Sequence, residues 1–343
     1  MDMKIYDPQE ETQWDERIAQ LDRPSLFYSS LWAAVLHDSY QYRPIYFVQR
    51  QGEAIHFLLP VMEISSRITG RRGVSLPFTD FCDPYVIDPI DFEPAISEAI
   101  ELGKQRGWRS LEIRGGKTLL KNQLSSRQYF QHQLNLGDPE TLFRNLKSST
   151  QRNIRKARKN GVVVRFDNST AAMEDFYRLN CLTRKKHGLP PQPISFFQNV
   201  LNNIIRTNHG VIAQATYHNK IIAAAIFFHF QKSVVYKYGA SDIDHLPLRA
   251  NNLLMWEAIA HFSGRNFEQL DFGKTEIANE GLRKYKLSWG ADEKRVPYYK
   301  YDYQSNSFIQ DRNKESGWYN AVFKKMPLPL LKLTGALLYK HVG

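Results

Sequence analysis

The chain has few cysteines and no long apolar run, and both absences limit what it can be. Its 343 residues include two cysteines, Cys82 and Cys181, far apart in the sequence. A disulfide-based fold normally needs more, so we expect two free thiols, as in a reducing cytoplasm. No run of about 18 apolar residues occurs, so no transmembrane helix is predicted. The polar, acidic first residues do not fit a secretory signal peptide.

Several catalytic and nucleotide-binding motifs are also missing. The chain has no Walker loop, no strand-linked GxGxxG and no G-x-S-x-G nucleophile elbow. The kinase-like "DFG" at Asp271 lacks the Gly-rich loop, the His-Arg-Asp loop and the Ala-Pro-Glu motif of protein kinases. The ten histidines show no metal-ligand spacing. We therefore predict no bound metal and no bound cofactor.

What the chain does have is apolar residues for folded cores and an excess of positive charge. Hydrophobic residues make up 42% and aromatic residues 13%, which argues against general disorder. Lys and Arg number 46 against 35 Asp and Glu, a net charge of +11. This charge favours an anionic partner, such as a nucleic acid, a phosphorylated small molecule or an acidic membrane surface.

Helix and strand patterns predict an α/β (α+β) fold built from two similar halves. In each half a hairpin is followed by a helix, a turn with glycine and an apolar strand. The strand "GWRSLEIRGGK" in the first half matches "NFEQLDFGKT" in the second, with Glu112 and Asp271 at equivalent positions. We interpret this as two copies of one unit. The predicted domains are residues 1–140 and 141–310, followed by a basic, Leu-rich tail at 311–343.

The segment between the halves is strongly basic. Residues 141–165 carry eight Lys or Arg and no acidic residue, while Leu142, Leu146 and Ile154 indicate an amphipathic helix pair. A solvated helix face and an anion-binding surface both fit this pattern. Arg152 and Arg155 are the candidate binding residues here. The segment also supports an alternative function, a nucleic-acid-binding module.

The C-terminal segment contains Pro327, Pro329 and a run of leucines with Lys332 and Lys340. It is too short to span a bilayer. We expect it to pack on the body as a terminal helix, and keep contact with an anionic membrane surface as the alternative. A non-catalytic membrane-surface protein is accordingly a third functional hypothesis.

Several segments together resemble the FemAB-like branch of the GNAT acyltransferases, which includes the peptidoglycan bridge aminoacyltransferases. They are "SSTQRNIRKARKNGVVV", "RKKHGLPPQPISFF", "VVYKYGASD" and "LLMWEAIAHFSGRNFEQLDFGKTEIANEGLRKYKLSWGA". The segment "SLPFTDFCDP" resembles relatives linked to exopolysaccharide systems. The resemblance is strongest over residues 142–303. It implies two tandem GNAT-like domains, each a mixed, mostly antiparallel sheet flanked by helices, and acyl or aminoacyl transfer to an amine.

The resemblance also implies where the site lies. An aromatic-Lys pair near the end of the second domain matches Tyr285-Lys286. The family's pattern implies that a backbone N–H of the pair and the lysine ammonium stabilise a developing oxyanion, and such donors contribute about 10²–10³ in rate. Arg283 and Lys284 then become candidates for substrate binding, against the alternative of a solvated helix face. The tyrosine of "YKYGAS", Tyr238, is a further candidate.

The sequence departs from the family pattern in three places. In some members of the family, a lysine on the first long helix and an arginine hold the diphosphate of a nucleotide precursor. Here the helix "LWAAVLHDSY" lacks the lysine, and Gln192 stands in place of the arginine. The [QR]xxGx[GA] pyrophosphate loop is absent, and "DHLPLRANNLLMW" occupies its place, with Arg249 at the expected helix start. We therefore expect an acceptor other than that precursor. Donor (charged tRNA or acyl-CoA), acceptor and oligomeric state stay open.

These observations favour an acyltransferase acting on an amine of a cell-envelope or exopolysaccharide-related acceptor. An acyl-CoA-dependent N-acetyltransferase and the nucleic-acid-binding module are the alternatives. We expect a cytoplasmic location, with peripheral membrane contact through the tail as an addition.

Overall fold

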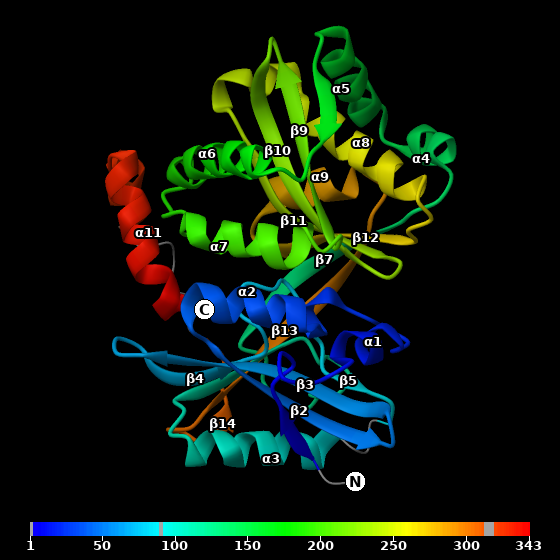
Figure 1. The fold of residues 1–343 in the computed structure, drawn as a ribbon. Helices are drawn as coiled ribbons and strands as arrows, with labels where there is room; N and C mark the ends of the chain where they lie inside the picture. Colours follow the sequence, from blue (N-terminus) through cyan, green and yellow to red (C-terminus); the bar gives the residue numbers. More distant parts are fainter. Residues whose placement is uncertain (1–2, 89–91, 312–318) are drawn as a thin grey trace. The chain divides into compact units, whose positions relative to one another are not determined.

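The computed structural model describes residues 3–88, 92–311 and 319–343 (Figure 1). The chain divides into two compact units that interleave in sequence. Unit 1 comprises Met1–Phe130, Arg295–Asn313 and Leu337–Gly343, and unit 2 comprises Gln131–Lys294 and Lys314–Ala336. The predicted domains followed one another along the chain. The observed units interleave because β13 (Asp292–Asp302) contributes to both, its second half pairing with β6 (Ser110–Arg114) in unit 1.

Unit 1 is a mixed sheet with helices on both faces. Its strands follow the order β1-β2-β3-β4-β6-β13, and the neighbouring pairs are antiparallel except β4 with β6, which are parallel. Figure 1 shows α3 on one face and α2 on the other. The elements are β1 Lys4–Tyr6, α1 Trp14–Ala19, α2 Ser30–Tyr40, β2 Arg43–Gln51, β3 Ala54–Ser66, β4 Gly70–Val74, β5 Tyr85–Val86, α3 Phe92–Gln105 and β14 Ser307–Phe308.

The core of unit 1 forms where α3 packs on the sheet. Phe92, Ala95 and Ala99 recur every three or four residues, which places them on one side of the helix. They pack with Phe57 and Trp108, and all five side chains are buried. The hairpin predicted in the first half is confirmed as β2 and β3, which turn at Gly52. The short strands β1, β4 and β8 were not predicted.

Unit 2 repeats this plan. Its strands run in the order β7-β12-β11-β10-β9-β8, and β11 pairs with β12 in parallel. Helices α5 and α8 cover one face, and α6 and α7 cover the other (Figure 1). The elements are β7 Arg127–Asn135, α4 Pro139–Asn145, α5 Ser148–Lys159, β8 Val163–Phe166, α6 Thr170–Lys186, α7 Ile194–Val200, β9 Gly210–Tyr217, β10 Lys220–Phe230, β11 Ser233–Ser241, α8 Ala250–Ser263, β12 Gln269–Glu276 and α9 Glu280–Leu287.

Each unit therefore contains one parallel strand pair joined through a helix, β4-α3-β6 in unit 1 and β11-α8-β12 in unit 2. The pairing gives Glu112 and Asp271 equivalent places, because each lies in the strand after that helix. The predicted duplication and the predicted fold class are confirmed. The chain ends in α10 (Tyr319–Lys325) and α11 (Leu328–Val342).

Candidate functional site

Lys286 is a lysine with its charged end buried. It lies in α9, which begins after Asn279, whose Oδ1 accepts a hydrogen bond from Leu282 N at 3.1 Å. The residue is 3% exposed. Its Nζ donates to the carbonyl oxygens of Gly273 at 2.8 Å and Lys274 at 3.0 Å. Since a buried ammonium is costly unless it is well bonded, this arrangement fixes α9 against the end of β12.

The two carbonyls are aimed by an unusual turn in β12. Gly273 has φ of 71°, a conformation that glycine adopts readily and other residues resist. Asp271 Oδ1 accepts from the N–H of Gly273 at 2.7 Å, and Asp271 Oδ2 accepts from the side chain of Gln131. Asp271 therefore shapes the turn that holds Lys286, and this accounts for the polar "DFGKT" after a buried strand.

A second polar cluster lies on the adjoining strands. His132 Nε2 and Glu293 Oε2 are 2.9 Å apart, and Arg283 bonds both Glu293 oxygens, at 2.7 and 2.8 Å. Burial, with the charge of Lys286 adding to it, lowers the pKa of His132, so the ring is neutral and donates from Nε2. The hydrogen bonds from Arg283 lower the pKa of Glu293.

This cluster changes the role expected for Arg283 and adds residues that sequence reasoning missed. Arg283 is engaged by Glu293 in a two-point ion pair, so we assign it to holding α9 on β13. His132 and Glu293 are 161 residues apart, and nothing local in the sequence links them. The only available signal was the alternation of β7, which gives His132 a face different from that of its neighbours.

Tyr285, the neighbour of Lys286 on α9, lines a cavity of about 240 Å³. The cavity walls come from β10, the end of β11, the start of α8 and α9, and they include Ser241, Asp242, Arg249, Asn251 and Tyr285. The Tyr285 ring packs edge-on against Trp289, with centroids 5.9 Å apart, and its burial raises the pKa of the phenol.

Arg249 stands directly before α8 with φ of 62°. Its backbone thus turns the chain into a 14-residue helix whose first residues, Ala250, Asn251 and Asn252, line the cavity, and the N-terminus of a helix is a favourable place for an anion. Asp242, also in the wall, bonds Lys220 at 2.8 Å, which lowers its pKa and balances its charge. The structure thus brings Arg249 and Tyr285 to one cavity.

Tyr238 lies elsewhere. Its ring packs against Phe197, with centroids 5.4 Å apart, and against Phe176 at 6.3 Å, on the side of the sheet covered by α6 and α7. Tyr236 packs against Phe227 and belongs to the core on the α8 side. The register of β10 with β11 shifts at this point, which sends the two tyrosines to opposite faces. Tyr238 is not among the residues that line the cavity.

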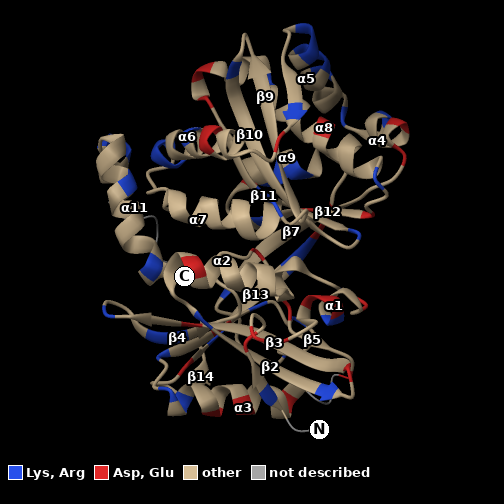
Figure 2. Cartoon of the chain, in the orientation of Figure 1, with Lys and Arg blue, Asp and Glu red and all other residues tan. Residues whose placement is uncertain are grey.

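The remaining candidates are exposed. Lys284 forms a surface ion pair with Glu280 at 3.2 Å, as expected for a solvated helix face. Arg152 and Arg155 lie on the exposed side of α5, and Figure 2 shows basic residues along this helix. The opposite side of α5 is buried, so the predicted amphipathic helix pair is confirmed by α4 and α5. Thr150 on α5 donates to the Ser288 carbonyl at 3.3 Å, which ties the basic helix to the end of α9.

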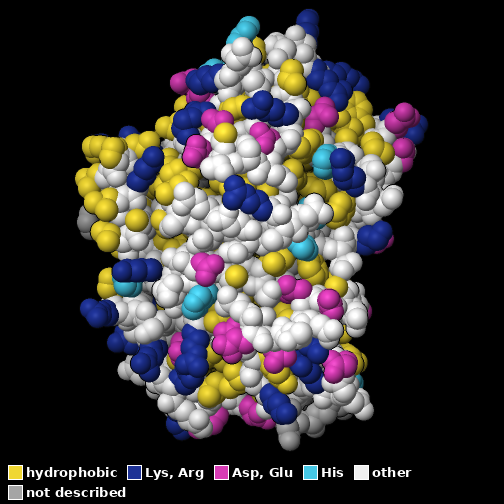
Figure 3. Space-filling model, in the orientation of Figure 1, with side chains coloured by type: hydrophobic (Ala, Val, Ile, Leu, Met, Phe, Trp, Pro, Cys, Tyr) yellow, Lys and Arg dark blue, Asp and Glu magenta, His cyan; other side chains and the backbone are white. Residues whose placement is uncertain are grey.

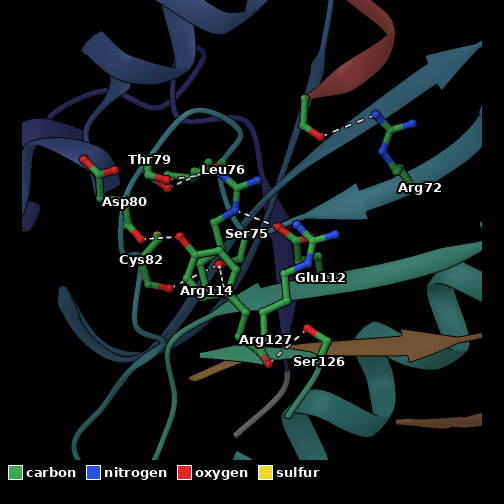
Figure 4. Close-up of polar contacts among 12 residues, drawn as sticks. Arg72, Ser75, Leu76, Thr79, Asp80, Cys82, Glu112, Arg114, Ser126 and Arg127 are labelled. Atoms are coloured by element: carbon green, nitrogen blue, oxygen red, sulfur yellow. Dashed lines mark hydrogen bonds and ion pairs between the residues drawn. The ribbon is translucent and has the colours of Figure 1, made fainter. Parts of the chain in front are cut away.

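In unit 1, the position equivalent to the Gly273 turn of unit 2 is occupied by an arginine that binds a loop of unit 1. Arg114, two residues after Glu112, corresponds to Gly273, two residues after Asp271. Figure 4 shows its guanidinium donating to the carbonyls of Leu76 and Thr79, both at 3.1 Å, and to Glu112 at 2.7 Å. The loop "SLPFTDFCDP" is thereby tied to β6. Unit 2 is therefore the better candidate for a substrate site.

The described part of the chain contains no group of three or more His, Cys, Asp or Glu that could hold a metal ion. Both cysteines are buried and free, as predicted. Within the same described residues, no helix has the length and apolar character needed to cross a membrane.

Comparison with known proteins identifies the fold. Residues 144–295 match the family model described as an acetyltransferase (GNAT) domain. The fold resembles FemX, with a TM-score of 0.69 and 12% identity over 89% of this chain and 98% of that one. It also resembles the C-terminal domain of a putative lysylphosphatidylglycerol synthetase from Agrobacterium fabrum, with a TM-score of 0.55 and 11% identity over 94% of each chain.

A tandem GNAT protein from the clavulanic acid biosynthesis pathway is similar as well, with a TM-score of 0.54 and 10% identity over 88% of this chain and 98% of that one. No curated protein sequence matches the chain. The resemblance predicted from the sequence is confirmed at this level: residues 144–295 match the acetyltransferase (GNAT) domain model, and the fold is shared with FemX and with a tandem GNAT protein.

Proposed function

We propose that this protein transfers an acyl or aminoacyl group to an amine, at a site in unit 2 built around Tyr285 and Lys286. The observation that carries the proposal is the buried Lys286 ammonium, which two carbonyls of β12 hold and which lies on the same helix as Tyr285, a residue that lines a cavity. A fixed positive charge in a site of low dielectric stabilises negative charge that develops during reaction far better than it would in water.

The reaction follows from this charge. The acceptor amine attacks the acyl carbonyl carbon, a C–N bond forms, and the carbonyl oxygen becomes an oxyanion stabilised by Lys286. The oxyanion then collapses, breaking the C–O bond of an aminoacyl ester or the C–S bond of a thioester, and the amine proton leaves to the released group or to solvent. The backbone N–H of Lys286 takes no part, because within α9 it is directed to the carbonyl four residues earlier.

Two donors fit different parts of unit 2. The cavity beside Arg249 and the N-terminus of α8 suits the phosphates of an acyl-CoA. The exposed basic side of α5, joined to α9 through Thr150, suits the backbone of a charged tRNA. Arg152 and Arg155 would contact that backbone. Lys284 and Tyr238 have no role in this proposal.

The acceptor class rests on the fold. FemX shares this fold, as does a domain of a lysylphosphatidylglycerol synthetase, whose name states a lysyl-modified phospholipid. We infer an amine acceptor of the cell envelope or of an exopolysaccharide. A cytoplasmic location is part of the proposal, since charged tRNA and acyl-CoA are both made there.

A donor screen tests the proposal. Purified protein is given a mixture of amines and either labelled aminoacyl-tRNA or labelled acyl-CoA, each supplied alone, and amide-linked label is counted. Transfer that depends on Lys286 supports the proposal, and the successful donor decides between the two classes. No transfer from either donor across envelope amines would contradict it.

A nucleic-acid-binding module is the second candidate, favoured by the exposed basic side of α5. Affinity for duplex DNA equal to that for charged tRNA, falling steeply with salt, would favour this function over acyl transfer.

A further inference from the structure

The C-terminal helix α11 exposes a stripe of leucines. Leu330, Leu333 and Leu337 are separated by three and four residues, which places them on one side of an α-helix. Their exposed fractions are 49%, 56% and 56%. Leucines so exposed on one line of a helix form an apolar strip rather than the scattered surface leucines of ordinary proteins.

The opposite side of α11 is fixed. Leu331 is completely buried, and Gly335 approaches the Pro191 carbonyl so closely that a Cβ would lie 1.9 Å from its oxygen. The terminal-helix packing expected from the sequence is thus present on this side. Because that packing sets the rotation of the helix, the leucine stripe cannot turn inward.

The stripe lies in a basic setting. Residues 319–343 contain four lysines and no acidic residue. Figure 2 shows lysines but no Asp or Glu on α11, and Figure 3 shows hydrophobic side chains gathered over the same helix. Helix α10 continues the pattern, with Tyr319 and Val322 exposed at 45% and 47% ahead of Lys324 and Lys325.

We propose that α10 and α11 dock the protein onto the surface of an anionic lipid bilayer, with the leucine stripe inserted and the lysines at the headgroups. The 15 residues of α11 span roughly 22 Å, less than the roughly 30 Å of a hydrocarbon core, so the helix lies along the surface. An apolar strip flanked by lysines, with tyrosine at its margin, is the composition of an interfacial helix. A protein partner is less well matched, because the strip lies on a convex helix side and not in a groove.

Vesicle flotation of the full chain tests the proposal without any turnover, so it is independent of the proposed catalytic function. The vesicles are an equimolar mixture of phosphatidylglycerol and phosphatidylcholine, or phosphatidylcholine alone. We expect binding to the anionic vesicles, weakened at least about tenfold in a Leu333→Gln/Leu337→Gln variant, since two apolar side chains no longer insert. A Lys324→Gln/Lys325→Gln variant should bind the anionic vesicles more weakly, and its remaining binding should be less sensitive to salt.

The matched control is Ile87→Gln/Leu124→Gln, which changes two equally exposed apolar residues outside α10 and α11. It should bind like the unaltered protein, and all variants should melt at the same temperature because the changed side chains are exposed. The proposal is overturned if the unaltered chain does not bind, or if the leucine variant binds as well as the control. It is equally overturned if the chain ignores lipid and self-associates through Leu333 and Leu337, as judged by light scattering.

Discussion

Replacing Lys286 with methionine removes the positive charge of this residue and keeps most of its side-chain volume. The methionine side chain is also unbranched and flexible, so it can follow the path of the lysine without its ammonium. The change removes the hydrogen bonds to the Gly273 and Lys274 carbonyls, at 2.8 and 3.0 Å. It leaves Asp271 and the turn that it holds in place.

Two opposing effects set the stability of the Lys286→Met variant. Each carbonyl left without its donor costs about 1–3 kcal/mol, or roughly 2–6 kcal/mol for the pair. In return, the variant no longer buries an ammonium, whose desolvation costs several kcal/mol. We expect the free energy of unfolding to change by no more than about 3 kcal/mol, below the total of about 5–15 kcal/mol for a typical domain, so the variant folds.

The effect on rate should be larger. Removing one group that stabilises an oxyanion costs about 10²–10³ in kcat, equivalent to about 2.7–4 kcal/mol. The assay is label transfer with the donor found in the screen, with kcat and KM measured separately. We expect kcat to fall and KM to change little, because the ammonium acts on charge that appears only during the reaction.

Lys284→Met on the same helix is the matched control. Lys284 and its partner Glu280 are both more than 70% exposed, so this variant should lose little stability and little rate. The reasoning is refuted if Lys286→Met is folded, as judged by circular dichroism and urea unfolding, and transfers label as fast as Lys284→Met.

Three further outcomes are expected. Gly273→Ala should lower the free energy of unfolding by about 1–2 kcal/mol, because its φ of 71° is unfavourable for alanine, whereas Gly281→Ala, inside α9, should not destabilise in urea titrations. The folded-state pKa of His132 lies below its unfolded value of about 6.5, so the unfolded chain binds more protons and stability falls as pH drops through that value. Between about pH 7.5 and pH 5.5, the free energy of unfolding should therefore fall less in His132→Gln than in the unaltered protein. An equal fall in both proteins, measured by urea unfolding, would contradict this. Arg249→Ala should raise KM for an acyl-CoA donor about tenfold. Arg152→Ala should instead weaken the binding of a charged tRNA and reduce the slope of that binding's salt dependence by about one unit. The reverse result would exchange the two assigned sites.

Local features of the fold were readable from the sequence because their causes are local. The hairpin of β2 and β3 follows from the turn residues at Gly52, and the helix of each unit that precedes the apolar strand follows from its run of apolar residues and the glycine after it. The duplication was readable too, because both copies keep the same order of helix, turn and strand. The strands β4 and β8 were missed, since "GRRGV" and "VVRF" are short and partly polar.

The candidate site was only partly readable. The sequence placed Tyr285 and Lys286 next to each other, but neighbours on a helix point about 100° apart, and one lines a cavity while the other bonds β12. Tyr238 illustrates the opposite difficulty. Strict alternation would place it on the same side as Tyr236, and the register shift between β10 and β11 reverses it.

Local patterns in the sequence predicted the α/β class, the two repeated units and the basic amphipathic helix, because each depends on residues close in the chain, whereas the Tyr285-Lys286 pair came from the family resemblance and stays a prediction. The tertiary structure decided which charges are paired and which are available. Glu293 neutralises Arg283 and meets His132 across 161 residues, while the packing of Leu331 and Gly335 turns the leucines of α11 outward. Such pairings depend on strand order and register, which bring distant segments together and leave no periodic signal in the sequence.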